Sequence, residues 1–341
     1  MAQRIQSHFS SYRFLYPVLL FLGVGAVAIH LAEGKQVWQT LCHSNWWLTT
    51  TAAILQLLLL LNQSALYSAT YRLVGLSEKT GRLFILVLTA SFTAVAVPGG
   101  TFSGVGLMIY DAMRKGMETA WAILANIIFF LLDYLAFLVV LVLALFYMFF
   151  RGALREYQLI ATGILTALVM VGLLLLVLVA VKPVAGATFG YKIIEISHLL
   201  PFVSLFSKKN AWEEKFTGFL ARLTEAINAL RANKSGFFRA GLHALLMEVI
   251  GLLQLEALFL AFGSHPAPGQ LITGYAVGVL FMIVSITPSG VGIMEGAMTT
   301  AYVSVGISLD KAALVTFTYR ALSFWFPVIA GFFVMRRVFR E

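Results

Sequence analysis

The residues able to do chemistry in this chain are a few ionisable groups set in or beside long apolar runs. These groups are Asp133, Glu248, Glu256, Glu295 and Arg320. A charge inside a bilayer is costly unless it is paired or hydrated, so each is a candidate for ligand binding or ion coupling. An ion pair between Glu295 and Arg320 would be either a ligand-responsive contact or a structural pin. Glu248 and Glu256 would serve either in proton coupling or as acids held by Gln254 or another polar partner.

Two Pro-Gly sequences break apolar runs, at Pro98-Gly99-Gly100 and at Pro288-Ser289-Gly290. Broken backbone is tolerated in a membrane only where it is buried in protein or lines a wet cavity. The half-helix after each break begins with free N–H groups and a positive dipole end, which attract phosphate or carboxylate. The alternative is that Gly and Pro only permit close helix packing. The predicted substrate-binding residues are Pro98, Gly99, Gly100, Gly104, Gly106, Pro288, Gly290, Gly292, Glu295 and Arg320.

The composition identifies the class of protein to which these residues belong. Of the 341 residues, 60% are hydrophobic and 11% are charged, whereas soluble domains carry about 25% charged residues. The sequence therefore predicts an all-α, polytopic membrane protein. Its net charge of +9 is better explained by cytoplasmic loops and anionic lipid headgroups than by nucleic acid.

Catalytic and metal-binding patterns are missing from the sequence. The single cysteine excludes an internal disulfide and a cysteine-based metal site, and the six histidines are scattered. The chain has no phosphate-binding loop followed by Lys, no His-Glu-x-x-His and no nucleophile elbow. We therefore expect no enzyme activity, no cofactor and no metal.

Eight apolar runs are long enough to enter a membrane. Four are uninterrupted, at 15–32, 48–71, 119–150 and 157–181, and four contain a break or an ionisable residue, at 83–110, 240–262, 265–306 and 312–335. The stretch 182–239 is the predicted cytoplasmic loop. Apolar residues at helical spacing predict an amphipathic helix over 211–231, lying either along the headgroups or against the underside of the protein.

Charge asymmetry decides how the two broken runs sit in the membrane. If both are re-entrant and the N-terminus is cytoplasmic, 19 Lys and Arg fall inside and 4 outside; if both cross, the counts are 10 and 13. The second arrangement violates the positive-inside rule. The sequence therefore predicts six full spans and two re-entrant broken-helix hairpins, with both termini cytoplasmic.

This topology makes residues 14–150 and 157–335 an inverted repeat. The six-residue sequences SGVGLM (103–108) and SGVGIM (289–294) fall at equivalent places in the two halves. Inverted repeats with broken helices near the bilayer midplane are the architecture of secondary transporters, in which the breaks mark the binding site.

The second break and the residues after it resemble a known signature. Pro288, Gly290, Gly292, Glu295, Gly306, Tyr319-Arg320, Pro327 and Gly331 resemble the C-terminal signature of the lysylphosphatidylglycerol synthase transmembrane-region family, the flippase-like membrane domains. In the first half, relatives often show Pro-Gly-Arg-x-Gly-Glu and a following Arg, where this chain has Pro98-Gly-Gly-Thr-Phe-Ser-Gly-Val-Gly106. Bifunctional members add a soluble aminoacyl-transferase domain; this chain ends at Glu341, so we do not expect it to be that synthase by itself.

The resemblance implies movement of a phospholipid or polyprenyl-linked lipid, with an anionic headgroup, between the leaflets of the cell membrane. Two alternatives remain: a non-transporting accessory protein for a lipid-modifying enzyme, and an intramembrane enzyme acting on a lipid headgroup. A cavity lined by both half-helix ends would favour transport. A dry interior with an apolar surface groove would favour the accessory role.

Overall fold

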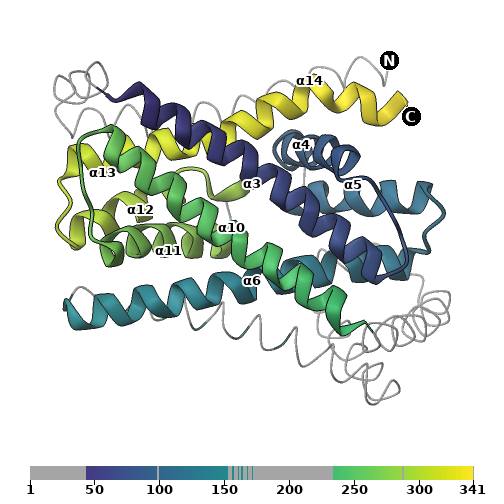
Figure 1. Cartoon of the computed structure of the whole chain (residues 1–341), viewed down its shortest axis with the longest axis horizontal. Helices are drawn as coiled ribbons and strands as arrows, with labels where there is room; N and C mark the ends of the chain where they lie inside the picture. The colour runs from purple at the N-terminus through teal and green to yellow at the C-terminus, as the bar shows by residue number, and fades with distance from the viewer. Residues whose placement is uncertain are drawn as a thin grey trace, which may run out of the picture.

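The computed structural model describes residues 44–97, 100–152, 233–285 and 288–340, together with five single positions between 156 and 171. Within these residues the expected all-helical fold is confirmed, since helices joined by short connections account for the chain (Figure 1). The predicted spans at 15–32 and 157–181 and the predicted amphipathic helix over 211–231 lie outside the continuous described stretches.

Among the described residues, four helical runs are long and apolar enough to cross a membrane. They are α3 (Trp46–Leu73), α6 (Thr119–Phe150), α10 (Lys234–Ala261) and a continuous run formed by α13 (Leu309–Arg320), the π-helical turn η3 (Ala321–Trp325) and α14 (Phe326–Arg340). Each coincides with a predicted span. α10 begins at Lys234, where the Asn233 side chain accepts a hydrogen bond from the Gly236 amide and caps the helix. The last residues of the predicted loop 182–239 are therefore helical.

The first broken run folds back on itself as a hairpin of α4 (Thr80–Ala96) and α5 (Thr101–Arg114). Arg82, near the start of α4, forms an ion pair with Asp111, near the end of α5. Nearer the turn, Gly104 of α5 lies against the backbone of Ala90 in α4. The two outer ends of this hairpin, which we call its open end, are therefore side by side.

The second broken run has the same form. It consists of α11 (Pro268–Val284), the short 3-10 turn η2 (Pro288–Gly290) and α12 (Ile293–Ser304). Gln270, near the start of α11, donates a hydrogen bond of 2.7 Å from Nε2 to the Val305 carbonyl just beyond α12. α12 has 12 residues, about 18 Å at 1.5 Å per residue, which is too short to cross a hydrocarbon core of about 30 Å.

Helices α3 and α10 run antiparallel through the centre of the molecule (Figure 1). At one end of the pair the Asn45 amide donates to the Ala261 carbonyl at 2.9 Å, and at the other Gly236 lies against Leu73. Between these ends Asn62 Nδ2 donates to the His243 carbonyl at 2.8 Å. Polar bonds of this kind hold helices together where lipid gives no hydrophobic advantage to contact.

The same order of elements occurs twice: a long helix, a hairpin and a second long helix. The second long helix of each half packs on the hairpin of the other half, α14 along α4 and α6 along α11 (Figure 1). Glycines permit both contacts: Gly331 lies against the Leu88 backbone, and Gly269 against the Tyr147 ring. The described halves are thus interlocked rather than simply placed side by side.

The outward faces of the long helices are apolar. Val142 on α6 and Leu242 on α10 are more than half exposed, and Phe333 on α14 is 73% exposed. Contiguous exposed apolar surface of this kind is what a bilayer covers. The polar side chains described next face the interior instead.

Candidate functional site

A cavity of about 220 Å³ lies between the two hairpins. Its wall is formed by residues of α3, α4, α5, α6, η2, η3 and α14: Gln63, Tyr67, Val87, Ala90, Ser91, Ala94, Thr101, Gly104, Val105, Phe129, Phe130, Asp133, Ser289, Ser323, Phe324, Pro327 and Val328. Thr101 and Gly104 belong to the first turn region of α5, and Ser289 belongs to the second break. The turns of both hairpins therefore reach the same space.

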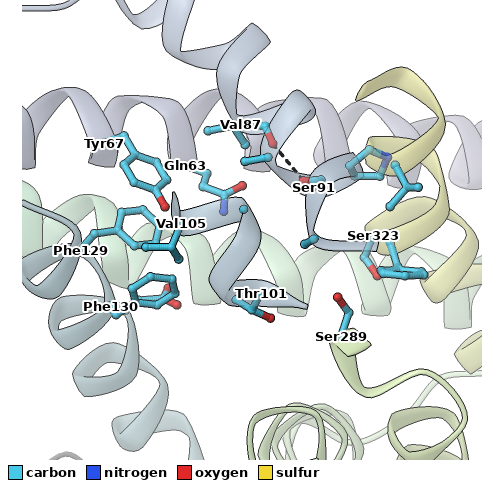
Figure 2. Close-up of a pocket in the computed structure, with 17 residues that line it drawn as sticks. Gln63, Tyr67, Val87, Ser91, Thr101, Val105, Phe129, Phe130, Ser289 and Ser323 are labelled. Atoms are coloured by element: carbon cyan, nitrogen blue, oxygen red, sulfur yellow. Dashed lines mark hydrogen bonds between the residues drawn. The ribbon is translucent and has the colours of Figure 1, made fainter. Parts of the chain in front are cut away.

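The wall has an aromatic side and a hydroxyl side. Figure 2 shows Tyr67, Phe129 and Phe130 together on one side, with Ser289 and Ser323 on the other. Thr101 lies between them at the start of α5. The only charged residue that lines the cavity among the described residues is Asp133 of α6. At this volume the cavity accommodates a small polar group or several waters, since one water occupies about 30 Å³ of liquid.

The backbone at the second break explains the sequence Pro-Ser-Gly-Val-Gly. Ser289, Gly290 and Gly292 have φ angles of 53°, 68° and 86°, in the left-handed region where glycine has no steric penalty. Gly290 also lies against the Met282 backbone of α11. The break is therefore a tight reversal of the chain, and it exposes Ser289 to the cavity.

Glu295 and Arg320 form the ion pair that the sequence suggested. Arg320 Nε donates to Glu295 Oε1 at 2.7 Å, and the Gly292 amide donates to Glu295 Oε2 at 2.7 Å. The guanidinium also donates to the Ser289 carbonyl at 3.1 Å and stacks 4.5 Å from the centre of the Phe324 ring. Both charged side chains are buried.

This ion pair lies one layer behind the cavity rather than in its wall. Two of its contacts, Ser289 and Phe324, do line the cavity. The pair therefore fixes the position of the second turn, and a ligand at Ser289 would act on Arg320 through that shared carbonyl. A direct contact of Glu295 or Arg320 with a ligand stays a prediction.

The other predicted binding residues are distributed unevenly around this site. Gly104 lines the cavity, Gly100 is the N-cap of α5 with a φ of 58°, and Gly106 is exposed and lies away from the wall. Pro98 and Gly99 lie outside the described residues. Pro288 begins η2, directly before Ser289.

The three acids proposed for coupling or pairing have different surroundings. Asp133 lines the cavity. Glu248 is buried on α10, where Tyr275 Oη donates to its Oε2 at 2.9 Å. Glu256 is exposed. Gln254, which we considered as a partner for these acids, instead donates to the Ala52 carbonyl of α3 at 3.3 Å.

A further ion pair at the open end of the first hairpin was not predicted. Arg82 donates from both terminal nitrogens to the two carboxylate oxygens of Asp111, each at 2.7 Å. Glu78 lies 3.8 Å from Arg82 and 3.5 Å from Lys115. Arg82 and Asp111 are at similar distances in sequence from the first break. Residues equally far from a reversal lie opposite each other in a hairpin, so this pair could have been predicted from the position of the break.

The fold and the site together define a multi-pass helical integral membrane protein with a cavity that the turns of two helical hairpins reach. The chain belongs to the family described as the lysylphosphatidylglycerol synthase TM region, whose model matches residues 14–331. The resemblance seen in the second break is thereby confirmed.

Relatives of similar length are archaeal membrane proteins. A UPF0104 membrane protein of Methanocaldococcus jannaschii is 24% identical over 335 residues, covering 95% of this chain and 94% of the relative. A UPF0104 membrane protein of Methanothermobacter thermautotrophicus is 22% identical over 319 residues, covering 91% and 88%. A third, of Pyrococcus horikoshii, is 25% identical over 131 residues, covering 38% and 39%.

Proposed function

We propose that this protein is a lipid translocase, moving a phospholipid or polyprenyl-linked lipid between the leaflets of the cell membrane. The observation that supports this function is the cavity itself, because turn residues of both hairpins, Thr101 and Ser289, line one space. The headgroup would occupy this cavity while the acyl chains stay in the surrounding bilayer. The proposal assigns no catalytic step to the chain.

The proposed topology has six full spans and two re-entrant hairpins, related as an inverted repeat. It is supported by the contacts at each open end. Glu78 lies within ion-pair distance of Arg82 and Lys115 at the first, while Lys311 Nζ donates to the Gly263 carbonyl at 3.0 Å at the second. Each hairpin thus begins and ends on one side of the molecule.

The two open ends lie at opposite ends of the antiparallel α3–α10 pair. α4 follows the end of α3, whereas the end of α10 meets the start of α3 through the Asn45–Ala261 hydrogen bond. Basic residues gather at the first open end, at the end of α3, around the start of α4 and at the end of α5: Arg72, Lys79, Arg82, Arg114 and Lys115. We propose that this end is cytoplasmic, in keeping with the positive-inside rule, and that both termini are cytoplasmic.

The proposed ligand chemistry is an anionic headgroup such as a phosphate. α5 begins at Thr101, which lines the cavity, and a helix N-terminus favours a negative group. The hydroxyls of Thr101 and Ser289 add donors. Arg320 lies behind Ser289 and is suited to bind phosphate bidentately if the turn moves.

Filling the cavity with a bulky side chain tests this function. Purified protein would be reconstituted in phosphatidylcholine vesicles that contain a small fraction of NBD-labelled phosphatidylglycerol, and dithionite would report the label in the outer leaflet over time. We expect Val105→Trp, in the cavity wall, to abolish translocation. The matched control Val139→Trp, on the exposed face of α6, should translocate as the wild type does.

Equal rates in both variants would contradict a route through the cavity. A folded wild type that moves neither this lipid nor a polyprenyl phosphate would favour the accessory role or a headgroup-modifying enzyme instead.

A further inference from the structure

We propose that Asp133 and Glu248 form a proton-binding site beside the cavity, and that the proton bound there couples lipid movement to a proton gradient. The coupling step rests on the proposed translocase function, whereas proton binding does not. The two residues lie on different long helices, α6 of the first half and α10 of the second.

Asp133 is the member of the site that faces the cavity. No Lys, Arg or His of the described part of the chain lies within ion-pair distance of its carboxylate. Aromatic rings of Tyr67, Phe129 and Phe130 line the same cavity. A partly exposed carboxylate with no opposite charge beside it is poorly compensated in a membrane interior.

Glu248 is the buried member, with 7% of its surface exposed. Its described hydrogen-bond partner is the Tyr275 hydroxyl, which donates to Oε2. Tyr275 is also buried, at 6% exposed. One neutral hydroxyl does not compensate a full negative charge in a membrane interior.

The charges between the two hairpins do not balance among the described residues. The acids there are Asp133, Glu248 and Glu295, and the only base is Arg320, whose Nε is bonded to Glu295. Asp133 and Glu248 lie on two helices that pack against each other, α6 and α10, and neither has a basic partner among the described residues. Two uncompensated carboxylates in a membrane interior are costly to ionise together, so we infer that the pair holds a proton.

The other titratable groups around the pair are phenols rather than cations. Tyr134 neighbours Asp133 on its own helix, and Tyr67 of α3 and Tyr275 of α11 lie in its electrostatic range. Tyr319 of α13 lies in range of Glu248. Arg320 adjoins Tyr319, but Glu295 neutralises it.

The proposed ligand would strengthen the binding of the proton at this pair. An anionic headgroup entering the cavity meets the Asp133 carboxylate in its wall, and the repulsion falls when that carboxylate is neutral. Lipid and proton would therefore bind together. With one proton per lipid, a difference of one pH unit supports about a tenfold difference in lipid between the leaflets.

The test uses the phosphatidylcholine vesicles with NBD-labelled phosphatidylglycerol, now with a difference of one pH unit across the membrane. The wild type should drive the label to about a tenfold excess in one leaflet, and reversing the gradient should reverse the excess. Glu248→Gln should still move the label but leave it equally distributed, and Asp133→Asn should likewise show no excess driven by the pH difference. Glu256→Gln, an exposed acid on the same helix as Glu248, should behave as the wild type.

A second measurement detects the proton without transport. Infrared spectra of the full chain at neutral pH should show the C=O band of a protonated carboxyl, and Glu248→Gln should remove or reduce it while Glu256→Gln retains it. If the band is present but no lipid moves, the proton site stands and the proposed function fails. If lipid moves but its distribution ignores the pH gradient, or follows a sodium gradient instead, the proton coupling is overturned.

Discussion

Glu295 satisfies two groups at once, the Arg320 guanidinium and the Gly292 amide at the second break. A break in a membrane helix leaves amides and a dipole end without partners, and this carboxylate supplies both hydrogen bonding and negative charge. At the scale of single residues, the acid seven positions after Pro288 is therefore what makes the tight turn stable in an apolar interior.

We expect Glu295→Gln and Arg320→Gln each to lower the free energy of unfolding by roughly 3–5 kcal/mol, because each leaves a buried charge without its partner. The double variant should recover much of this loss, since no charge remains uncompensated. Thermal unfolding in detergent, beside the vesicle assay, would measure both properties.

The double variant separates a structural pin from a role in transport. We expect it to be folded but inactive, because Arg320 can no longer respond to a ligand at Ser289. A double variant that is stable and translocates at the wild-type rate would remove the ion pair from the mechanism.

The sequence predicted the ionisable residues that lie inside apolar runs and missed those at the margins of the runs. Glu295 and Arg320 were identified because both lie in apolar sequence, where any charge is conspicuous. Arg82 and Asp111 were missed because they stand at the margins of the apolar run, where charges are ordinary. Asp133 was identified as a candidate, but its position in the cavity wall was not. Each step along a helix turns the side-chain direction by about 100°, and the sequence does not show how one helix is rotated relative to its neighbours.

Glycines determine how closely the legs of each hairpin approach. A Cβ at Gly104 would meet the Ala90 carbonyl oxygen at 2.8 Å, whereas a Cβ at Gly106, two positions on in the same helix, would meet nothing within 4 Å. At the scale of the elements, one of these glycines is needed for packing and the other is not.

We therefore expect Gly104→Ala to destabilise the protein by roughly 1–3 kcal/mol, since the added methyl group has to displace backbone. Gly106→Ala should be neutral or stabilising by up to about 1 kcal/mol, because alanine favours the helix. Thermal midpoints of the two variants would decide this, and equal midpoints would contradict the close approach of α4 and α5.

The hairpin geometry also predicts which loops share a side of the membrane. In a Cys42→Ser background, single cysteines at Ser264 and Ser308 should both react with a membrane-impermeant reagent from outside the cell, and one at Ser77 only from inside. Ser264 and Ser308 flank the second hairpin, and Ser77 precedes the first. Labelling of Ser264 and Ser308 from opposite sides would show that the second hairpin crosses the membrane.

The existence of the hairpins was predictable from the sequence, but their partners were not. Pro-Gly breaks and helix lengths each concern one segment at a time, and within the described residues each broken run does consist of two helices that fold back on each other. That these hairpins are re-entrant in the membrane, as the charge asymmetry indicated, stays a prediction. The packing of α14 on α4 and of α6 on α11 depends on side-chain fit between distant segments. The π-helical turn directly after Arg320, which brings Ser323 and Phe324 to the cavity, had no signal in composition or periodicity.

At the scale of the whole molecule, we expect the α3–α10 pair to stay rigid during translocation while the hairpin turns that line the cavity move. In a Cys42→Ser background we expect a short thiol cross-linker between Ala52→Cys and Gln254→Cys, on α3 and α10, to leave translocation unchanged. The same reagent between Thr101→Cys and Ser289→Cys, in the cavity wall, should stop it. Loss of activity from the first cross-link would show that α3 and α10 move apart during translocation. Each double-cysteine protein without the reagent is its own control.

The antiparallel α3–α10 pair has a mechanical consequence. Contacts join the two helices at both ends: a hydrogen bond between Asn45 and Ala261, and packing of Gly236 against Leu73. Two further hydrogen bonds join them along their length, between Gln254 and Ala52 and between Asn62 and His243. Two helices joined at four points cannot slide or twist against each other without breaking several of these contacts together. In the proposed translocase, the pair would therefore stay fixed within the described part of the molecule, while the hairpins and the long helices packed on them would tilt against it as a headgroup passes.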